Sequence, residues 1–332
     1  MNFQRLRIIR ETVRRDFNLT EVAQALCTSQ PGVSKHIKEL EDELGVELFI
    51  RRGKRLLDLT EPGRELLAVV ERILIDAQNL QKIADQFSGS EQGRLRVATT
   101  HTQARYALPL VIKKFRHDFP KVHLALYQGS PKEIAAMVVA GEADIAIATE
   151  TLDQNPGLVT FPCYSWHHAV IVPEAHPLCE LENLSLEALA EYPIITYQDG
   201  FTGRSHIDDA FARAGIVPDI VMSAIDADVI KTYVEVGLGI GIIASMAYMQ
   251  NRDQGLFLLN GDHLFQRNTT RLAIRRGEYL RGYTYRFIES FAPHLNESLV
   301  RQALMRDGGS PFDEGLLLAA CHEVQGFMQF KM

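Results

Sequence analysis

The sequence predicts an α/β protein with a small N-terminal head, one long connecting helix and a larger two-lobed body. Three observations lead to this fold class. The first 60 residues hold short helical patterns followed by an alternating segment that breaks at a glycine. A heptad pattern then runs to residue 87, and beyond residue 94 strand-like and helix-like segments alternate. Such alternation is typical of parallel sheets covered by helices.

Composition indicates a globular protein of two or three domains. The chain has 332 residues, of which 46% are hydrophobic and 23% charged. We see no signal peptide and no apolar run near the roughly 20 residues of a membrane span, so we expect a cytoplasmic protein without membrane contact. Although the net charge is -7, residues 1–38 carry seven Lys or Arg against three acids. The four cysteines lack the paired spacing of a zinc site or a disulfide framework.

Residues 29–45, SQPGVSKHIKELEDELG, predict a helix with one apolar face and one polar, basic face. Thr28 or Ser29 can cap its start, Pro31 suits its first turn and Gly45 ends it. The apolar positions are Val33, Ile37, Leu40 and Leu44, and the polar positions are Gln30, Ser34, Lys35 and Lys38. Such a helix would enter a DNA major groove by its N-terminus, with its acidic C-terminal end kept away. An ordinary amphipathic surface helix is the alternative.

The segments around this helix favour DNA binding. Residues 3–15 predict a first helix, and residues 20–26, with Thr20 as the cap, predict a second one that a tight turn joins to the third. This is the pattern of a helix-turn-helix. Residues 46–59 then predict a β-hairpin with a basic tip formed by Arg52 and Lys54. The tip suits a wing laid along a phosphate backbone, and a solvated loop is the alternative.

Residues 61–87 predict one long helix, with Thr60 as its cap and Pro62 in its first turn. Its apolar residues recur at steps of four and three for three heptads, at Leu66, Val70, Ile73, Ala77, Leu80, Ala84 and Phe87. A strict 3.5-residue repeat makes a narrow seam suited to a partner helix, so we expect self-association through a coiled coil. Packing of this helix on its own domain is the alternative.

The body of the chain predicts two α/β lobes joined by crossing strands. A polar, glycine-containing hinge at 88–93 precedes it, and we place the DNA-binding domain at 1–60. The first lobe is expected at 94–164 and 268–300, the second at 165–267, and a tail of unassigned role at 301–332. Two such lobes leave a cleft at the carboxyl ends of their strands, the usual place for a small ligand.

The segment LTEVAQALCTSQPGVSKHIKELEDELGVELFIRRGKRLLDLTEPG closely resembles the winged helix-turn-helix signature of LysR-type transcriptional regulators. The body resembles the cysteine-regulon activators of that family in ATTHTQARYALP, QGSP, ADIAIATE, CYSW, GFTGRS, DADVIKTYVEVGLGIGIIASMA and FAPHL. The resemblance covers about residues 1 to 295. It implies a periplasmic-binding-protein-like effector domain and a homo-oligomeric activator, typically a tetramer, at sulfur-assimilation promoters. The implied effectors are N-acetylserine, sulfate or thiosulfate. The resemblance implies no cofactor, and it allows RNA polymerase as a further partner.

Polar residues gather where the predicted effector lobes would meet. Thr100 ends a strand while Thr102 and Gln103 open the next helix, whose free N–H groups attract anions. The resemblance assigns effector contacts, motif by motif, to Thr100, Thr102, Gln103, Thr149 and Thr202, and an apolar wall to Trp166. The alternative is that these threonines only cap strands and helices.

Other functions are less well supported by the residues. His101, His167 and His168 lack the partner patterns of catalytic or metal sites, so we expect surface or loop histidines, no metal and no enzyme. A stand-alone solute-binding protein would share the two lobes but would have no use for residues 1–87. Within the regulator class, the alternative is a LysR-type regulator of another sulfur or small-anion pathway.

Overall fold

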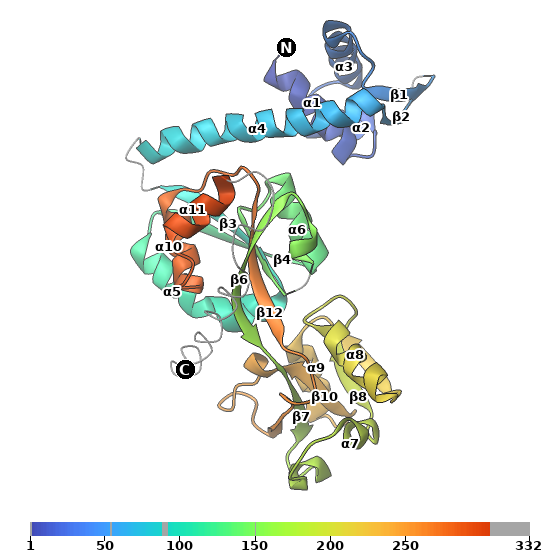
Figure 1. Cartoon of the computed structure of the whole chain (residues 1–332), viewed down its shortest axis with the longest axis vertical. Helices are drawn as coiled ribbons and strands as arrows, with labels where there is room; N and C mark the ends of the chain where they lie inside the picture. Colours follow the sequence, from blue (N-terminus) through green and yellow to red (C-terminus); the bar gives the residue numbers. More distant parts are fainter. Residues whose placement is uncertain (1, 54, 88–91, 150, 306–332) are drawn as a thin grey trace. The chain divides into compact units, whose positions relative to one another are not determined.

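A computed structural model describes residues 2–53, 55–87, 92–149 and 151–305 (Figure 1). By internal contacts the chain divides into two units, Met1–Ser88 with Gly277–Tyr279 and Gly89–Arg276 with Leu280–Met332. In the part of the chain that the structure describes, every helix is too short or too polar to span a membrane. The predicted tail beyond Met305 lies outside the described residues.

The first unit contains the predicted helix-turn-helix, hairpin and long helix. Its elements are α1 (Phe3–Arg14), α2 (Leu19–Ala25), α3 (Gln30–Leu44), β1 (Phe49–Arg52), β2 (Arg55–Leu59) and α4 (Glu61–Phe87). Strands β1 and β2 pair antiparallel around Gly53, whose φ of 63° suits a tight turn. Val33, Ile37 and Phe49 are fully buried, so α3 and the hairpin share one small apolar core.

Caps define the helix starts of this unit, with one departure from the sequence prediction. Asn18, and not Thr20, caps α2, because its side chain accepts from the N–H groups of Thr20 and Glu21. Ser29 caps α3 by accepting from the N–H of Gly32 over 3.3 Å. Leu44, expected on the packed face, is 39% exposed because it belongs to the last turn of α3.

The heptad seam of α4 has two environments. Its first half packs on its own unit: Val70 is buried, and Leu66 and Ile73 are partly buried against the same core. Its second half is open, since Leu80 is 69% and Phe87 82% exposed. The alternative of packing on its own domain is therefore right for the first half, and only the second half retains a seam free for a partner.

The second unit contains two five-stranded sheets. The first has the strand order β4-β3-β5-β12-β6, in which β3, β4 and β5 are parallel and β12 is antiparallel to both β5 and β6. Its strands are β3 (Gly93–Thr99), β4 (Val122–Gln128), β5 (Ile145–Ala148), β6 (Leu158–Trp166) and β12 (Asn268–Arg275). Its helices are η1 (Gln103–Ala107, a π-helix), α5 (Leu108–Asp118), α6 (Pro131–Ala140), α10 (Gly282–Phe291) and α11 (Glu297–Met305), with η2 (Leu152–Gln154) between β5 and β6. We call this sheet and its helices lobe 1.

The second sheet has the order β11-β7-β10-β8-β9, with β8, β9 and β10 parallel and β7 antiparallel to β10. Its strands are β7 (His168–Pro173), β8 (Ile194–Tyr197), β9 (Ile220–Ala224), β10 (Ile240–Ala244) and β11 (Leu256–Asn260). Its helices are η3 (Pro177–Glu180), α7 (Leu186–Ala190), α8 (Arg204–Ala214), α9 (Ala227–Glu235) and η4 (Ser245–Ala247). We call this sheet and its helices lobe 2.

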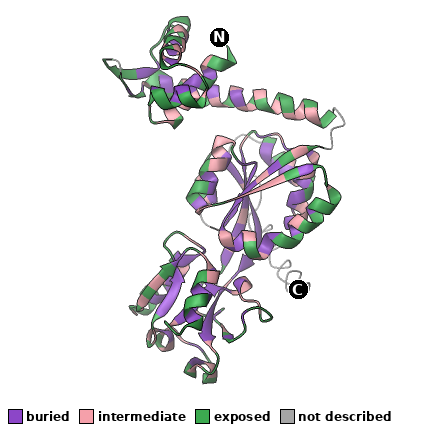
Figure 2. Cartoon of the chain, turned by 180° about the vertical axis from the view of Figure 1, so that it is seen from behind, coloured by how far each residue is buried: buried purple, intermediate pink, exposed green. Residues whose placement is uncertain are grey.

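Long strands connect the lobes. Strand β6 pairs with β12 along its whole length and continues almost at once into β7 of lobe 2 (Figure 1). The central strands are buried while the outer faces of the helices are exposed, so each lobe has its core on its sheet (Figure 2). The predicted fold class is confirmed. Helix α11 runs across residue 300, where lobe 1 was expected to end.

Candidate functional site

The polar face of α3 is accessible at its N-terminal end. Ser29, Gln30, Lys35 and Lys38 are exposed, and Thr28 and Ser34 are half-buried. The side chain of Lys35 is 75% exposed and only approaches Glu39 at 3.8 Å, which is a weak surface pair. This face can therefore meet a charged surface such as DNA. Arg52 on the hairpin is exposed too, and Lys54 lies outside the described residues.

Glu41, expected to be part of a distant acidic end, instead joins α3 to the hairpin. It is buried, and it accepts from the N–H groups of Leu48 over 2.9 Å and Phe49 over 3.3 Å. Its second oxygen pairs with Arg51 at 2.5 Å. A buried carboxylate with three donors fixes the position of the hairpin relative to α3. Sequence reasoning missed this role because the partners are in another element.

Four of the predicted effector residues follow the ends of strands in lobe 1. Thr100 follows β3 and Thr149 follows β5, and these strands are parallel neighbours, so both residues lie at the carboxyl edge of the sheet. The chain turns helical after Thr100, and the N–H of Ala104 already bonds to its carbonyl. Thr102 and Gln103 are buried in this first turn. The earlier N–H groups have no acceptor within the helix and can face a ligand.

Thr102 and Thr202 bring the two lobes together. Their hydroxyl oxygens are 3.4 Å apart, and both residues are buried. Thr102 makes no capping hydrogen bond, so capping does not explain its hydroxyl. Thr202 lies in the loop between β8 and α8, at the carboxyl edge of the lobe 2 sheet. Two hydroxyls at this distance can donate to one oxygen of a small anion.

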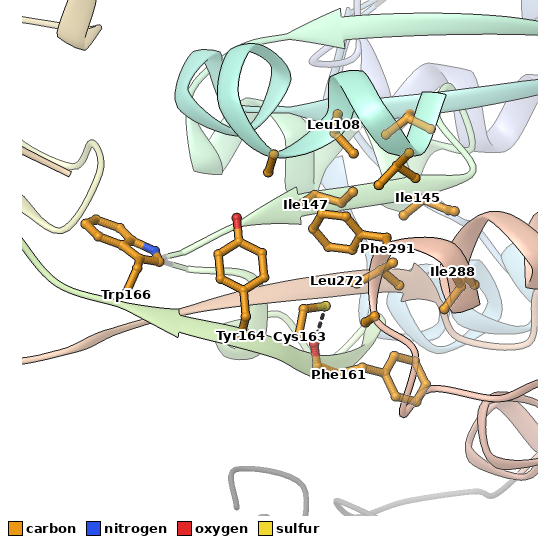
Figure 3. Packing of buried hydrophobic residues seen from close by; sticks show 14 of the residues in the cluster. Leu108, Ile145, Ile147, Phe161, Cys163, Tyr164, Trp166, Leu272, Ile288 and Phe291 are labelled. Carbon is orange, nitrogen blue, oxygen red and sulfur yellow. Dashed lines mark hydrogen bonds between the residues drawn. The ribbon is translucent and has the colours of Figure 1, made fainter. Parts of the chain in front are cut away.

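A second polar group continues this site inside lobe 1. The Gln103 amide donates to the Thr270 hydroxyl over 3.1 Å and accepts from the Tyr164 hydroxyl. The Trp166 indole N–H also donates to Thr270, over 3.1 Å. Tyr164 and Trp166 project from the same side of β6 (Figure 3). Trp166 is thus not only an apolar wall, because its N–H belongs to a hydrogen-bonded network that holds Gln103.

The position of His168 differs from the one that the sequence predicted. It was expected at the surface, but it is fully buried as the first residue of β7, an antiparallel strand that begins at the edge where β8 and β10 end. Burial lowers the pKa of His168 to about 4, so its ring is neutral near pH 7. Its Nε2 lies 3.0 Å from the Thr202 carbonyl, and its Nδ1 lies 3.3 Å from the Asn268 amide.

Lobe 1 and lobe 2 also meet through a polar cluster beside the threonines. The Tyr106 hydroxyl donates to Asp228 over 2.7 Å, and Arg105 pairs with the other Asp228 oxygen at 2.7 Å. Lys231 donates to Tyr106 over 3.1 Å and to Asp253 over 2.9 Å. Burial opposes ionisation of Asp228, but its hydrogen bonds to Tyr106 and Lys231 and the charges of Lys231 and Arg105 outweigh it and lower its pKa. We call these five residues the lobe latch.

One group of side chains has the composition of a metal site. His101, Asp226 and Asp228 each place one candidate ligand atom within 4.8 Å of the others. Asp228 already pairs with Arg105 and Lys231, and these two positive charges oppose a cation. This group therefore does not fit a metal ion well.

Two family models match the chain. Residues 3–64 match "Bacterial regulatory helix-turn-helix protein, lysR family", and residues 88–296 match "LysR substrate binding domain". Among characterised sequences, the HTH-type transcriptional regulator SsuR of Burkholderia cenocepacia is 63% identical over 308 residues, which are 92% of this chain and 100% of that protein. The HTH-type transcriptional regulator cbl of Escherichia coli is 53% identical over 313 residues, covering 94% and 99% of the two chains.

Solved structures agree with these matches. The cofactor-binding domain of the Cbl transcriptional regulator superposes with a TM-score of 0.64 at 50% identity, covering 66% of this chain and 96% of that one. A full-length OxyR from Pseudomonas aeruginosa has a TM-score of 0.62 at 22% identity, over 89% and 94% of the two chains. The second likeness concerns the fold alone.

Proposed function

This chain belongs to the LysR family of transcriptional regulators, and on that premise we propose that it controls sulfur-assimilation genes in response to a small anion bound between lobes 1 and 2. Members of this family regulate transcription and are not enzymes. They bind promoter DNA and small-molecule effectors, and they are oligomeric. The control of sulfur-assimilation genes and the identity of the effector are the parts that we propose for this chain.

The proposed DNA contacts lie on α3 and the hairpin. Gln30, Ser34 and Lys35 would approach base edges in the major groove, beside Thr28 and Ser29 at the helix start. The remaining basic side chains, Lys38, Arg52 and Lys54, would contact phosphates and set the register. Support comes from the exposure of Gln30 and Lys35 and from the Ser29 cap, which fixes where the helix begins.

The proposed effector is an acetylated amino acid such as N-acetylserine, or sulfate or thiosulfate. Its contacts would be Thr100, Thr102, Gln103, Thr149, Trp166 and Thr202. The observation that carries the proposal is the 3.4 Å approach of Thr102 and Thr202, buried hydroxyls from different lobes. A helix start and two hydroxyls can bind an anion without a lysine. Because the proposed contacts come from both lobes, the ligand would favour one lobe arrangement.

Titration of the full-length protein tests the effector site. Trp166 is the single tryptophan of the chain and reaches Thr270 in the same network, so its fluorescence reports on the site directly. We expect a saturable change with N-acetylserine, sulfate or thiosulfate, and about tenfold weaker binding in Thr102→Val and Thr202→Val, the upper range for one lost hydrogen bond. Thr269→Val is the matched control, since Thr269 lies on the same strand as Thr270 but is directed to the other face.

Three results would separate the candidate functions. Binding that is unchanged in both valine variants places the ligand elsewhere. Binding of a small anion unrelated to sulfur, with none of the three tested ligands bound, favours the alternative of a regulator of another pathway. Turnover of N-acetylserine would contradict the regulator assignment.

We also propose that the chain assembles as a tetramer. A closed tetramer built from dimers needs two different self-complementary surfaces. One is the open half of α4, with Leu80 and Phe87 exposed. The other is an apolar surface of lobe 2 on α9 and the edge strand β9, formed by Val221, Ile225, Val229, Tyr233 and Val236. Light scattering should give dimers for Leu80→Glu and for Val236→Glu, and unchanged tetramers in both would refute these surfaces.

A further inference from the structure

Thr202 adopts a backbone conformation that its side chain disfavours. Its φ is 46°, in the left-handed region, and the flanking Gly200 and Gly203 have φ of 78° and 69°. Glycine enters this region freely, whereas a β-branched residue is strained there. Strain of this kind persists only where surrounding contacts impose it, and it is concentrated at functional sites. The loop that presents the Thr202 hydroxyl must therefore be held by specific partners.

His168 is a partner of the Thr202 backbone. Its Nε2 lies 3.0 Å from the Thr202 carbonyl oxygen, and the residue is fully buried. The ring is fixed by edge contacts to Trp166, with centroids 5.1 Å apart, and to Phe265, with centroids 5.7 Å apart. A ring that cannot rotate holds the carbonyl in one position. The carbonyl in turn sets the ψ of Thr202.

The partners also define which nitrogen of His168 carries the proton. The Thr202 carbonyl can only accept, so Nε2 must donate. In the neutral ring Nδ1 is then an acceptor, and the Asn268 Nδ2 group donates to it over 3.3 Å. Asn268 is 1% exposed and pairs with Trp166 across β6 and β12. Asn268, a residue of the lobe 1 sheet, thereby orients a histidine of lobe 2.

Gly203 lies in close contact with both His168 and Asn268. A Cβ at this position would lie 2.0 Å from Asn268 Oδ1 and 2.9 Å from His168 Cε1. Only glycine lets the loop approach so closely, and its φ of 69° favours glycine as well. Asn268 and His168 therefore both pack against the turn, and His168 also hydrogen-bonds to it.

We propose that His168, oriented by Asn268, is a positioning residue for the effector site: it fixes the strained Thr202–Gly203 turn and so places the Thr202 hydroxyl against Thr102. His168 does not contact the ligand in this proposal. It acts by keeping a contact residue in a conformation that the free loop would rarely adopt, which reduces the ordering cost of binding. The proposal rests on the proposed effector function.

A purely structural histidine would behave differently. If His168 only filled the core, an apolar residue of similar size would serve as well as a polar one. If it positions Thr202, a side chain that keeps an N–H donor at the place of Nε2 should preserve binding. Glutamine offers such a donor, and leucine does not. The contrast between His168→Gln and His168→Leu therefore separates positioning from packing.

His263 supplies a matched control. It belongs to the same unit, and its Nε2 lies 2.7 Å from the Leu184 carbonyl, so it makes the same kind of bond to the backbone. Neither residue is among the proposed effector contacts. His263→Leu thus removes a histidine–carbonyl bond without touching the Thr202 turn.

Calorimetric titration of the full-length variants with sulfate and with N-acetylserine is the test. We expect about tenfold weaker binding for His168→Leu, binding within about threefold of wild type for His168→Gln, and wild-type binding for His263→Leu. Equal binding by His168→Leu and His168→Gln, whether weakened or not, would overturn the proposal. If His168→Leu does not fold, Asn268→Leu replaces it, with an expected loss of about threefold, and wild-type binding by that variant would refute the proposal.

Hydrogen exchange of residues 198–206 in the free protein tests, without a ligand, whether His168 fixes the Thr202–Gly203 turn. We expect faster exchange in His168→Leu than in His168→Gln, and unchanged exchange there in His263→Leu. If wild type binds neither ligand while this exchange contrast holds, the effector assignment fails and the turn-holding role stands. If wild type binds ligand and the exchange contrast is absent, the positioning role fails alone.

Discussion

The Tyr106 hydroxyl donates to an Asp228 oxygen over 2.7 Å, and this bond joins the helix after β3 in lobe 1 to α9 in lobe 2. The same helix carries Thr102 and Gln103 in its first turn. Burial raises the pKa of Tyr106, so its hydroxyl remains a donor at neutral pH. The lobe latch and the threonine pair therefore close the same lobe interface from one helix.

Removing this bond should weaken effector binding without removing a ligand contact. In Tyr106→Phe the ring remains but the hydroxyl that joins the lobes is lost, so the closed arrangement is less populated before ligand arrives. We expect about fivefold weaker binding, corresponding to about 1 kcal/mol for one hydrogen bond to a charged group that is partly exposed. Calorimetry with the effector measures this change.

Tyr283→Phe is the control for the latch. Its hydroxyl donates to the Arg94 carbonyl over 3.1 Å within lobe 1, so the same chemical change leaves the lobe interface intact. Equal losses in the two variants would show that the latch does not control the lobe arrangement.

Glu41 should determine the stability of the DNA-binding head. Glu41→Gln removes the charge opposite Arg51 and weakens two bonds to backbone N–H groups at the start of the hairpin. We expect a loss of about 1 to 3 kcal/mol in the free energy of unfolding of this unit, followed by urea denaturation. Glu43→Gln is the comparison, because Glu43 pairs with Arg5 at the surface, where solvent screens the pair, and its replacement should change the stability much less. Similar losses in both variants would mean that burial of Glu41 has no special effect.

Local patterns were sufficient for the elements of the head. Apolar spacing, a cap and a closing glycine located α3 correctly, because all three act within one helix. The choice of Thr20 over Asn18 failed because both are good caps two residues apart, and only the backbone shows which one accepts. The heptad pattern of α4 could not show what its seam packs against. Leu66 and Val70 have the same spacing as Leu80, yet they pack on their own unit.

The candidate site was only half predictable for a topological reason. Thr100, Thr102 and Gln103 follow one strand, so their convergence can be read from local order. Thr270 lies 167 residues from Gln103 and reaches it only because β12 is inserted antiparallel beside β5. His168 was misjudged for the same reason, since a strand that starts at the carboxyl edge of the other strands is buried by its neighbours and not by its own sequence.

Arg52 should contribute to DNA binding through charge alone. It is exposed on β1 next to the hairpin turn, where a wing would meet phosphates. In Arg52→Ala, the slope of log affinity against log salt should become shallower by about 0.9, on any duplex, because one fewer counterion is released. Fluorescence anisotropy at several salt concentrations measures the slope, and no operator sequence is needed.

The control for Arg52 is an exposed arginine of the other unit. Arg286 on α10 is 66% exposed in its side chain and pairs with Glu289. Its replacement by alanine should leave the slope unchanged. A slope that falls equally in both variants would reflect net charge and not a wing contact.

His168 should make the protein less stable in mild acid. Burial lowers its folded pKa to about 4, while a histidine in an unfolded chain titrates near pH 6.5. Between these values the unfolded state binds a proton that the folded state does not, so stability falls as the pH drops from about 6.5 towards about 4. Above about pH 7, His168 does not lower the stability of the folded protein in this way. From pH 7 to pH 5 the expected loss is about 2 kcal/mol for this residue.

Replacing His168 by glutamine isolates this effect, because glutamine keeps a donor for Thr202 and does not titrate. The pKa values of His167 and His176 are also lowered, with burial as the largest cause, so wild type and His168→Gln should both lose stability in acid through those residues. The difference between the two proteins then belongs to His168. Urea denaturation at pH 7 and at pH 5 should show wild type losing about 2 kcal/mol more than the variant. Parallel losses would mean that the folded protein protonates His168 as readily as the unfolded chain, which the burial of His168 opposes.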